Sequence, residues 1–302
     1  MNREFLPLLE KIEESILSAI DSRLFLQSDL LFGHLDECVT PDYFNALAQP
    51  ASDLIKSGGK RWRPLFLVLC ALAYAEKSSF AEKETELVKQ NAFLLTPLVE
   101  FVHTASLIHD DIEDKADSRR GKPAAYITYG TDVAINAGSW LYFQAASPIE
   151  KADISLELKN RLYKALTLEL RRLHLGQAMD ITWHRHKAVI PSVEEYLAMV
   201  KCKTGTLASL SAKTGCLVAS ADDDFAGKTA LVAAEIGAGF QIIDDVINLT
   251  LGNPGKKRGD DIVEGKKSLP VLIFAKKNPS DFKTLTSYFE DAAQNGIESP
   301  AV

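Results

Sequence analysis

The sequence predicts an all-α protein, and three observations carry that prediction. Apolar side chains recur at helical spacing along almost the whole chain, as in the four-residue repeat Ile12, Ile16, Ile20 and Leu24. Segments that alternate apolar and polar residues, the usual sign of a strand, are almost absent. No internal repeat of fixed period divides the chain. Residues 1–302 are therefore expected to form one domain of about ten helices, with the helices of residues 1–57 at its periphery.

Helix boundaries follow from capping residues and helix breakers. Thr40-Pro41 and Ser192 are expected to begin helices, because a capping hydroxyl satisfies free amide groups and proline suits the first turn. Gly205 permits a break or a close backbone approach. The expected helices cover residues 12–24, 41–57, 65–75, a long segment to 114 with a kink at Pro97, 131–146, 153–183 with Asp153 as cap, 192–203, 205–220, 228–251 and 268–276.

Composition excludes several classes of protein. With 302 residues, 46% of them hydrophobic, the chain can bury a large core. A net charge of −7 argues against nucleic-acid binding, which needs a basic surface. The four cysteines lack paired-ligand spacing, so we expect reduced thiols and a cytoplasmic protein. Charges interrupt the N-terminal apolar residues, so no signal peptide is expected. No membrane span is expected either, because no window of about eighteen residues is apolar without interruption.

The first candidate site is an acidic helix end followed by two arginines. Asp110 and Asp114 are four residues apart and share a helical face, with Asp111 beside them. Crowded carboxylates repel one another unless a cation neutralises them, and oxygen ligands of this kind suit Mg²⁺. The guanidinium groups of Arg119 and Arg120 suit the oxygens of a diphosphate. A solvated acidic helix end before a basic turn is the alternative interpretation.

A second acidic pair, Asp244 and Asp245, lies inside an otherwise apolar helix, where carboxylates need partners. Asp244 and Asn248 share a face of that helix. An asparagine oxygen carries no charge, so this site should hold its ion more weakly than the first. Two such faces lining one pocket would clamp a diphosphate through bridging Mg²⁺ ions. A solvated helix end is again the alternative.

Cations on three separate elements are positioned to converge on one anion: Lys60 and Arg63, His103, and Arg120. Further lysines lie later in the chain, in loops or at helix ends: Lys203, Lys256, Lys257, Lys266 and Lys267. Each lysine alone is more often only solvated, and a lone histidine is more often a core residue. Their occurrence together with two acidic motifs favours a phosphate-binding function.

Six blocks, in order between Gly58 and Pro270, resemble the trans-isoprenyl diphosphate synthases, the polyprenyl synthetase family: GGKRWRP, HTASLIHDDIEDKADSRRGKP, LHLGQAMDITW, EEYLAMVKCKTGTL, GFQIIDDVINL and DDIVEGKKSLP. DDIED, GQAMDITW and the terminal Asn of the second motif are most similar to the eukaryotic-type geranylgeranyl diphosphate synthases. The resemblance implies an isoprenoid-synthase fold, with helices around a central cavity, commonly as a homodimer. It implies a Mg²⁺-dependent prenyltransferase that condenses isopentenyl diphosphate with an allylic diphosphate, which is dimethylallyl, geranyl or farnesyl diphosphate.

The resemblance also implies roles for single residues. Three Mg²⁺ ions would be held directly by Asp110, Asp114 and Asp244, with Asp111 supporting, Asp245 acting through water and Asn248 ending the second motif. The allylic diphosphate would contact Arg119, Lys203, Thr204, Gln241, Lys266 and either Lys256 or Lys257. Isopentenyl diphosphate would contact Lys60, Arg63, His103 and Arg120. The catalytic set would be Asp110, Asp111, Asp114, Arg119, Lys203 and Asp244.

Two features depart from the family pattern. Ser139 stands near a position where eukaryotic-type members often carry Asn, and the family usually extends several dozen residues beyond the position of Pro270, so the C-terminal helices are expected to be reduced or incomplete. A class I terpene cyclase and a non-catalytic partner subunit are the competing functions. The cations favour elongation, because a cyclase needs no isopentenyl diphosphate site and a partner subunit could lose such residues.

Product length is predicted from helix geometry. The growing chain should run back from Asp110 along its own helix, which rises about 5.4 Å per turn, on the order of one isoprene unit. Ala105 and Ser106 at the first turn and Val102 one turn deeper are small, so this helix provides no early barrier. Trp140, Tyr142 or Phe143 would provide the barrier, although aromatics at this spacing are more often core. Geranylgeranyl diphosphate (C20) is the expected product, with farnesyl or longer polyprenyl diphosphates as alternatives.

Overall fold

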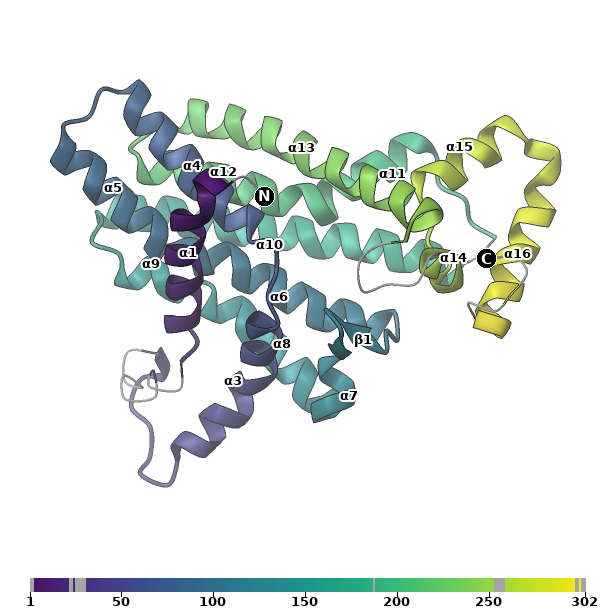
Figure 1. The fold of residues 1–302 in the computed structure, drawn as a ribbon, viewed down its shortest axis with the longest axis horizontal. Coiled ribbons are helices and arrows are strands. Elements are labelled where there is room, and N and C mark those ends of the chain that lie inside the picture. The colour runs from purple at the N-terminus through teal and green to yellow at the C-terminus, as the bar shows by residue number, and fades with distance from the viewer. Residues whose placement is uncertain are drawn as a thin grey trace. The chain divides into compact units, whose positions relative to one another are not determined.

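A computed structural model describes residues 3–21, 24, 31–186, 188–252, 259–296 and 299. Most of these residues are helical and very few lie in strands (Figure 1), which confirms the all-α prediction. The chain divides into two compact units. Unit 1 comprises Met1–Leu168 and Leu210–Ala230, and unit 2 comprises Glu169–Ser209 and Leu231–Val302. The expectation of a single domain stays a prediction.

The structure contains the following helices and strands, some of which the sequence does not predict. Unit 1 contains η1 (Arg3–Phe5), α1 (Leu6–Ser18), α3 (Pro41–Lys56), α4 (Trp62–Lys77), α5 (Glu82–Leu94), α6 (Thr96–Glu113), β1 (Ser118–Arg119), β2 (Lys122–Pro123), α7 (Ala125–Tyr129), α8 (Thr131–Gln144) and α9 (Ser147–Lys151). Unit 2 contains α11 (Val193–Val200), η3 (Lys201–Gly205), α14 (Asp260–Glu264), α15 (Leu269–Lys277), η4 (Pro279–Asp281) and α16 (Phe282–Asn295). Helices α10 (Leu156–Arg185), α12 (Thr206–Val218) and α13 (Asp223–Thr250) have residues in both units. Helices α7, α9, α14 and α16 and the two strands are not anticipated by the sequence patterns.

Helix α6 is the central element of unit 1. It packs against α1, α3, α4, α5, α7, α8 and α9. Leu98, Phe101, Ala105 and Ile108 are at most 1% exposed, so the apolar run before Asp110 is a buried core helix. Burial of apolar surface area, such as that of this helix, is the main favourable term in the free energy of folding. The same packing fixes the position of the acidic end of α6.

The predicted kink at Pro97 is a break between α5 and α6. Proline has no amide hydrogen, so Pro97 cannot donate to the carbonyl of Phe93 four residues earlier. That carbonyl instead accepts hydrogen bonds from the hydroxyls of Thr96 (2.7 Å) and Ser15 (2.7 Å). Ser15 belongs to α1, so the break also ties α1 to the centre of unit 1.

Capping residues set several other boundaries. Ser192 and Glu195 form the predicted capping box, in which each side chain accepts a hydrogen bond from the other residue's amide. Asp222 accepts from the amide of Phe225 at the start of α13, as a cap should. The cap predicted at Asp153 is wrong: Ser155 accepts the amide hydrogen bond of Leu158 at the start of α10.

The basic turn after α6 is a two-residue hairpin. Ser118 pairs with Pro123 and Arg119 with Lys122 in antiparallel register. The two residues between the strands, Arg120 (φ 54°) and Gly121 (φ 76°), both have positive φ. A two-residue hairpin loop requires this conformation when its twist matches the strands. The hairpin sends the adjacent side chains of Arg119 and Arg120 to different partners.

One helical stretch, Glu82–Glu113, is long and apolar enough to cross a membrane by length and composition alone. Glu100 interrupts its apolar residues, so the expectation that no uninterrupted apolar window of this length occurs is not contradicted. In addition, 67% of its most apolar part is buried inside the protein, as in the core helix of a soluble protein. This stretch comprises α5 and α6, whose packing within unit 1 is described above.

Helix α12 approaches α4 within unit 1 at Gly215. A Cβ atom on Gly215 would lie 2.3 Å from the Leu67 carbonyl oxygen and 2.9 Å from Cβ of Cys70, so the backbones must separate to accept it.

Gly215→Ala should lower the free energy of unfolding by about 1–3 kcal/mol, as overpacking does. Gly227→Ala in α13 is the matched control, because no atom lies within 4 Å of its Cβ position. It should raise stability by about 0.5–1 kcal/mol. Denaturant titration of both variants measures the difference, and equal effects would contradict the close approach.

Candidate functional site

The last turn of α6 carries the first acidic group. The side chain of Asp110 is 19% exposed, whereas Asp111 is 1% exposed. Asp114 is the residue that ends the helix, and its amide donates to the Asp110 carbonyl at 2.8 Å. Asp110 and Asp114 therefore keep the shared face that their spacing predicts, and both are partly exposed.

Arg119 neutralises the buried member of this group. Its Nε donates to Oδ1 of Asp111 at 2.8 Å, its Nη2 contacts the same oxygen, and Nη2 lies 3.8 Å from Oδ2 of Asp110. Burial alone lowers the pKa of Arg119, but the hydrogen bond and charge of Asp111, with the charges of Asp110 and Asp114, raise it overall. Asp111 thus supports the group from inside, while Asp110 and Asp114 lie nearer to solvent.

The donor chemistry of this helix end fits Mg²⁺. Among the described residues, no three Asp, Glu, His or Cys side chains lie close enough together to form a metal site alone. Mg²⁺ needs no such cage, because it usually takes one or two carboxylates from the protein and completes its shell with water and substrate phosphates. Asp110 and Asp114 supply two partly exposed carboxylates on one face. They are the residues that would hold the ion.

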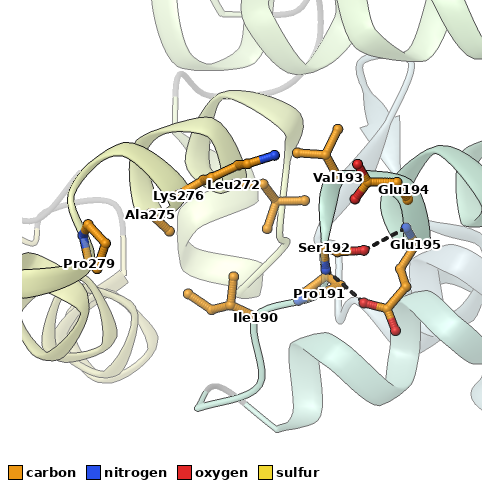
Figure 2. A pocket seen from close by; sticks show the side chains of 10 residues that line it. All are labelled: Ile190, Pro191, Ser192, Val193, Glu194, Glu195, Leu272, Ala275, Lys276 and Pro279. Atoms are coloured by element: carbon orange, nitrogen blue, oxygen red, sulfur yellow. Dashed lines mark hydrogen bonds between the residues drawn. The ribbon is translucent and has the colours of Figure 1, made fainter.

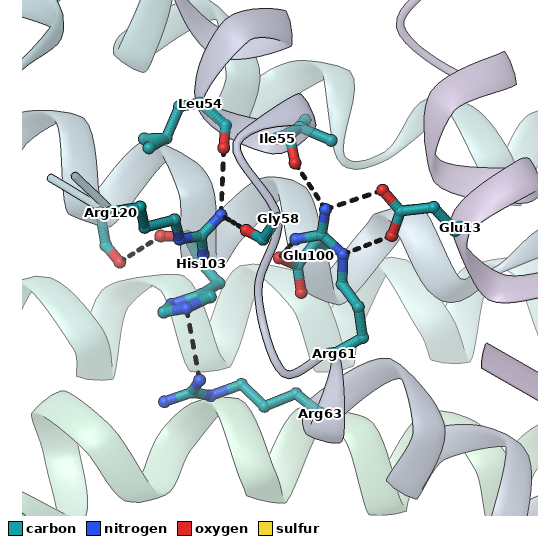
Figure 3. Close-up of polar contacts among 10 residues, drawn as sticks. Glu13, Leu54, Ile55, Gly58, Arg61, Arg63, Glu100, His103 and Arg120 are labelled. Carbon is teal, nitrogen blue, oxygen red and sulfur yellow. Dashed lines mark hydrogen bonds and ion pairs between the residues drawn. The ribbon is translucent and has the colours of Figure 1, made fainter. Parts of the chain in front are cut away.

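The predicted cation group forms in unit 1, where Figure 3 shows His103 between the guanidinium groups of Arg63 and Arg120. Arg63 Nη1 lies 3.4 Å from Nε2 of His103. Burial lowers the pKa of His103 well below its usual value, and the charges of Arg63 and Arg120 lower it further. His103 is therefore neutral near pH 7, so Nε2 can accept from Arg63. Lys60 is exposed in the same turn.

Arg120 is tied to the turn that precedes Lys60. Its Nη1 donates to the carbonyl of Leu54 at 3.0 Å and also to the carbonyl of Gly58. Burial lowers the pKa of Arg120, and the negative charge of Glu100 opposes that effect. The hairpin, the end of α3 and the turn before α4 are thus joined by one guanidinium group.

In unit 2, Lys203 and Thr204 lie in η3, a five-residue π-helix. Such widened turns recur at functional sites, because they leave backbone groups outside the regular ladder. Lys203 Nζ donates to Oδ2 of Asp180 at 2.6 Å, and Asp180 is 7% exposed. Gly176 permits this approach of α10 to η3, since a Cβ atom there would lie 2.4 Å from the amide nitrogen of Lys203.

Asp245 joins three segments of unit 2. Its Oδ2 accepts hydrogen bonds from the hydroxyl of Tyr196 (2.5 Å) and the amide of Leu269 (3.2 Å), while Oδ1 accepts from Nε2 of Gln241 (3.0 Å). Gln241 Oε1 in turn accepts from the hydroxyl of Thr204 at 3.0 Å. Asp245 therefore holds two of the predicted diphosphate contacts, Gln241 and Thr204, in a fixed arrangement. Its predicted metal contact through water stays a prediction.

The rest of the second acidic motif is divided between solvent and core. Asp244 is partly exposed, whereas Asn248 is fully buried. The side-chain oxygen of Asn248 accepts from the amide of Asp261 at 3.4 Å, and its carbonyl accepts from Gly259 at 3.1 Å. Asn248 thus supports the start of α14. Its metal-binding role stays a prediction.

The later lysines have different surroundings. Lys266 Nζ lies 2.5 Å from Oε2 of Glu264, and Lys267 is 3% exposed with Nζ 3.9 Å from the ring centre of Phe289. Lys256 and Lys257 lie outside the described residues, so their contact with a diphosphate stays a prediction.

Comparison with known proteins identifies the family. Residues 44–299, most of the chain, match the family model described as polyprenyl synthetase. The chain belongs to the polyprenyl synthetase family. It is 35% identical over 243 residues to the geranylgeranyl diphosphate synthase of Methanosarcina mazei, which covers 79% of this chain and 70% of that protein. It is 34% identical over 207 residues to a geranylgeranyl pyrophosphate synthase of Macrophomina phaseolina, covering 68% of this chain and 61% of the relative's length.

Solved structures show the same fold. The crystal structure of the geranylgeranyl pyrophosphate synthetase from Pyrococcus horikoshii superposes with a TM-score of 0.77 at 29% identity, covering 95% of this chain and 79% of that one. The isoprenoid-synthase fold predicted from the sequence is therefore confirmed.

The residues predicted to set product length differ in burial. Val102 and Ala105 are 1% and 0% exposed, and Ser106 is partly exposed. On α8, Trp140 packs edge-to-face on Phe44 at 5.9 Å, and Tyr142 stacks on His109 at 5.7 Å between ring centres. Phe143 is 81% exposed and so does not face the interior of this chain. Trp140 and Tyr142 remain the candidates on α8 for the barrier.

Four polar residues that hold the predicted ones in place were missed by sequence reasoning: Arg61, Glu100, Asp180 and Tyr196. Glu100 and Asp180 had a visible signal, because each is an acid beside apolar residues and so needs a partner. Their partners could not be identified from spacing, since Arg61 is 39 residues from Glu100 and Lys203 is 23 residues from Asp180.

A pocket of about 560 Å³ lies elsewhere in unit 2, between the start of α11 and α15 (Figure 2). Its lining is largely apolar and includes Ile190, Val193 and Leu272, with Glu194 and Lys276 among its charged residues. It contains none of the residues predicted to bind metal or diphosphate.

The hydrogen bond between Tyr196 and Asp245 should contribute measurably to stability. Burial, followed by the charge of Asp245, raises the pKa of Tyr196, so the phenol stays protonated and donates at any ordinary pH. Tyr196→Phe should lower the free energy of unfolding by about 1.5–3 kcal/mol, as for a bond to a charged group. Tyr288→Phe is the control, because Tyr288 is 51% exposed and should change stability by less than about 0.5 kcal/mol. An equal loss of unfolding free energy in the two variants would show that the hydrogen bond between Tyr196 and Asp245 does not stabilise the fold.

Proposed function

We propose that the chain is a Mg²⁺-dependent prenyltransferase that condenses isopentenyl diphosphate with an allylic diphosphate. The observation that carries the proposal is the presence in unit 1 of two separate groups of charged residues whose chemistry suits diphosphate binding. One is the acidic end of α6, which fits Mg²⁺, and the other is the group of Arg63, His103 and Arg120. A reaction of two diphosphates needs both. The names of the Methanosarcina and Macrophomina relatives support the same activity.

Each set of residues has a distinct task in the proposed reaction. The cation group with Lys60 would bind the diphosphate of isopentenyl diphosphate. The allylic diphosphate would contact Arg119, Lys203, Thr204, Gln241, Lys266 and one of Lys256 and Lys257. Three Mg²⁺ ions, held by Asp110, Asp114 and Asp244, would stabilise the negative charge that develops on the leaving diphosphate.

The proposed chemistry needs no nucleophile from the protein. The bond between the allylic carbon and its diphosphate oxygen breaks, and the double bond of isopentenyl diphosphate forms the new carbon–carbon bond. A proton then passes from the condensed product to the released diphosphate. The cations of the chain hold the two substrates in register, and apolar side chains keep water from the carbocation.

We propose geranylgeranyl diphosphate as the main product, formed by a cytoplasmic homodimer. The four cysteines are free thiols, as expected in a reducing compartment. Apolar side chains are exposed along α8 and the first part of α10: Ile135 45%, Phe143 81%, Leu156 84% and Leu168 42%. An exposed apolar surface of this kind suits a second copy of the chain. A solution mass of one chain, measured by sedimentation, would overturn the dimer.

Loss of the proposed Mg²⁺ ligands should abolish the activity. Asp110→Ala or Asp114→Ala should lower turnover of isopentenyl and farnesyl diphosphates by several orders of magnitude, because each removes a ligand from the ion that stabilises the leaving group. Asp153→Ala removes an exposed aspartate and is the control, with wild-type turnover expected. Near-normal turnover of either α6 variant with Mg²⁺ would remove that residue from the site.

A bulky side chain at the first turn below Asp110 should shorten the product. Ala105→Phe should shift the main product from C20 to C15, because the aromatic ring closes the path along α6. Ala105 is 0% exposed, so Ser106→Phe, at a partly exposed neighbour, is the second variant if the first fails to fold. Chromatography of the dephosphorylated products measures the product length of the wild type and of each variant. A wild-type product mainly of C15, or of C30 and longer, would contradict the proposed barrier.

A further inference from the structure

Arg61 lies between two residues of the cation group but has a different environment. Lys60 is exposed and Arg63 is directed to His103, whereas Arg61 is 5% exposed. Its backbone adopts a positive φ of 48°, which non-glycine residues seldom do. This conformation places the side chain of Arg61 inside unit 1, while the side chains of Lys60 and Arg63 take other directions. The function proposed above assigns no role to Arg61.

Three helices bind the guanidinium group of Arg61 (Figure 3). Its Nε donates to Oε2 of Glu13 in α1 at 2.7 Å, and Nη2 donates to Oε1 of Glu13 at 3.0 Å. Nη1 donates to Oε1 of Glu100 in α6 at 2.7 Å. Nη2 also donates to the carbonyl of Ile55 at the end of α3, at 2.6 Å. All three nitrogens are engaged, in the forked geometry that arginine provides and lysine does not.

Glu100 is the partner that connects Arg61 to the cation group. It is 2% exposed and lies on α6 three residues before His103. The ion pair with Arg61 therefore links the turn that carries Lys60 and Arg63 to the helix that carries His103. Glu100 also supplies negative charge among Arg61, Arg63 and Arg120, which would otherwise repel one another.

Gly59 brings Arg61 and Arg120 close together. A Cβ atom on Gly59 would lie 3.0 Å from Nη1 of Arg61 and 3.0 Å from Nη2 of Arg120. The two guanidinium groups thus pack against the same glycine. Arg61 fixes the turn from the side of α1 and α6, and Arg120 fixes it through the carbonyls of Leu54 and Gly58.

We propose that Arg61 and Glu100 are positioning residues for anion binding, which set the turn of residues 58–63 so that Lys60, Arg63, His103 and Arg120 meet one diphosphate. The inference rests on the proposed function and names the side chains that preorganise its second substrate site. Neither Arg61 nor Glu100 needs to contact the substrate. Each acts through the backbone and charges of its neighbours.

Two variants test this positioning role. Glu100→Gln keeps the size of the side chain but removes its charge, and Arg61→Lys keeps the charge but loses the fork. Both should weaken the binding of isopentenyl diphosphate about tenfold or more, because preorganisation of charge-assisted contacts is lost. Gly59→Ala should act in the same direction through the displaced guanidinium groups. If Arg61→Lys does not fold, Glu100→Gln and Gly59→Ala still test the proposal.

Arg161 provides a matched control in the same unit. Like Arg61, it binds a carboxylate and a backbone carbonyl, with Nε and Nη2 on Oδ1 of Asp223 at 3.0 and 2.8 Å and Nη2 on the carbonyl of Ala221 at 2.9 Å. It lies at a different turn, so Arg161→Lys should leave binding of isopentenyl diphosphate unchanged.

Calorimetry with isopentenyl diphosphate, without Mg²⁺, and steady-state kinetics with both substrates form the test. The proposal predicts weaker binding and a raised KM for isopentenyl diphosphate in Glu100→Gln and Arg61→Lys, with the KM for the allylic substrate changed less than about twofold. Variants that bind like the wild type, or that lose only kcat, would overturn the positioning role and leave the proposed function intact. A wild-type protein that binds no isopentenyl diphosphate would overturn both.

Discussion

Charge that is buried inside unit 1 must be neutralised within the protein, and this requirement arranges the region around α6. Glu100 and Asp111 both lie on the inner side of that helix, at 2% and 1% exposure. Each meets an arginine from a neighbouring turn, Arg61 for Glu100 and Arg119 for Asp111. A buried carboxylate without such a partner would be strongly destabilising. The two ion pairs therefore fix both basic turns against α6.

These ion pairs leave the groups nearer to the surface for ligands. Arg119 neutralises the buried Asp111, while Asp110 and Asp114 remain partly exposed at the same helix end. Arg61 is held by Glu13 and Glu100, while Lys60 in the same turn is exposed. Each motif thus combines a residue that maintains the structure with residues that are accessible to an anion or a cation. The same division occurs in unit 2, where Asp245 accepts three hydrogen bonds from the protein and Asp244 is partly exposed.

Much of the local structure could be predicted from the sequence, because its causes are local. Proline at position 97, the capping pair Ser192 and Glu195, and glycine at position 205 act on their own helix turns, and the structure bears out each of them. Gly205 also shows the limit of such reasoning. A Cβ atom there would lie 2.7 Å from the carbonyl of Ala234, a neighbour that no local pattern identifies.

Features that depend on distant partners could not be predicted. The hairpin requires a positive φ at Arg120, a conformation that arginine seldom adopts. In the structure, Arg120 also donates hydrogen bonds to the carbonyls of Leu54 and Gly58, which are distant in the sequence. The burial of Asn248 depends on the start of α14, a helix that the sequence patterns do not reveal. Tertiary contacts decide both cases, and residue spacing carries no information about them.

The central claim is that the chain joins two diphosphate substrates, and one comparison tests it most directly. The purified protein is incubated with Mg²⁺ and farnesyl diphosphate, with and without isopentenyl diphosphate, and all organic products are analysed by chromatography. We predict no product from farnesyl diphosphate alone and a prenyl diphosphate longer by one isoprene unit when both substrates are present. Release of a hydrocarbon from farnesyl diphosphate alone, or no elongation with both substrates, would contradict it.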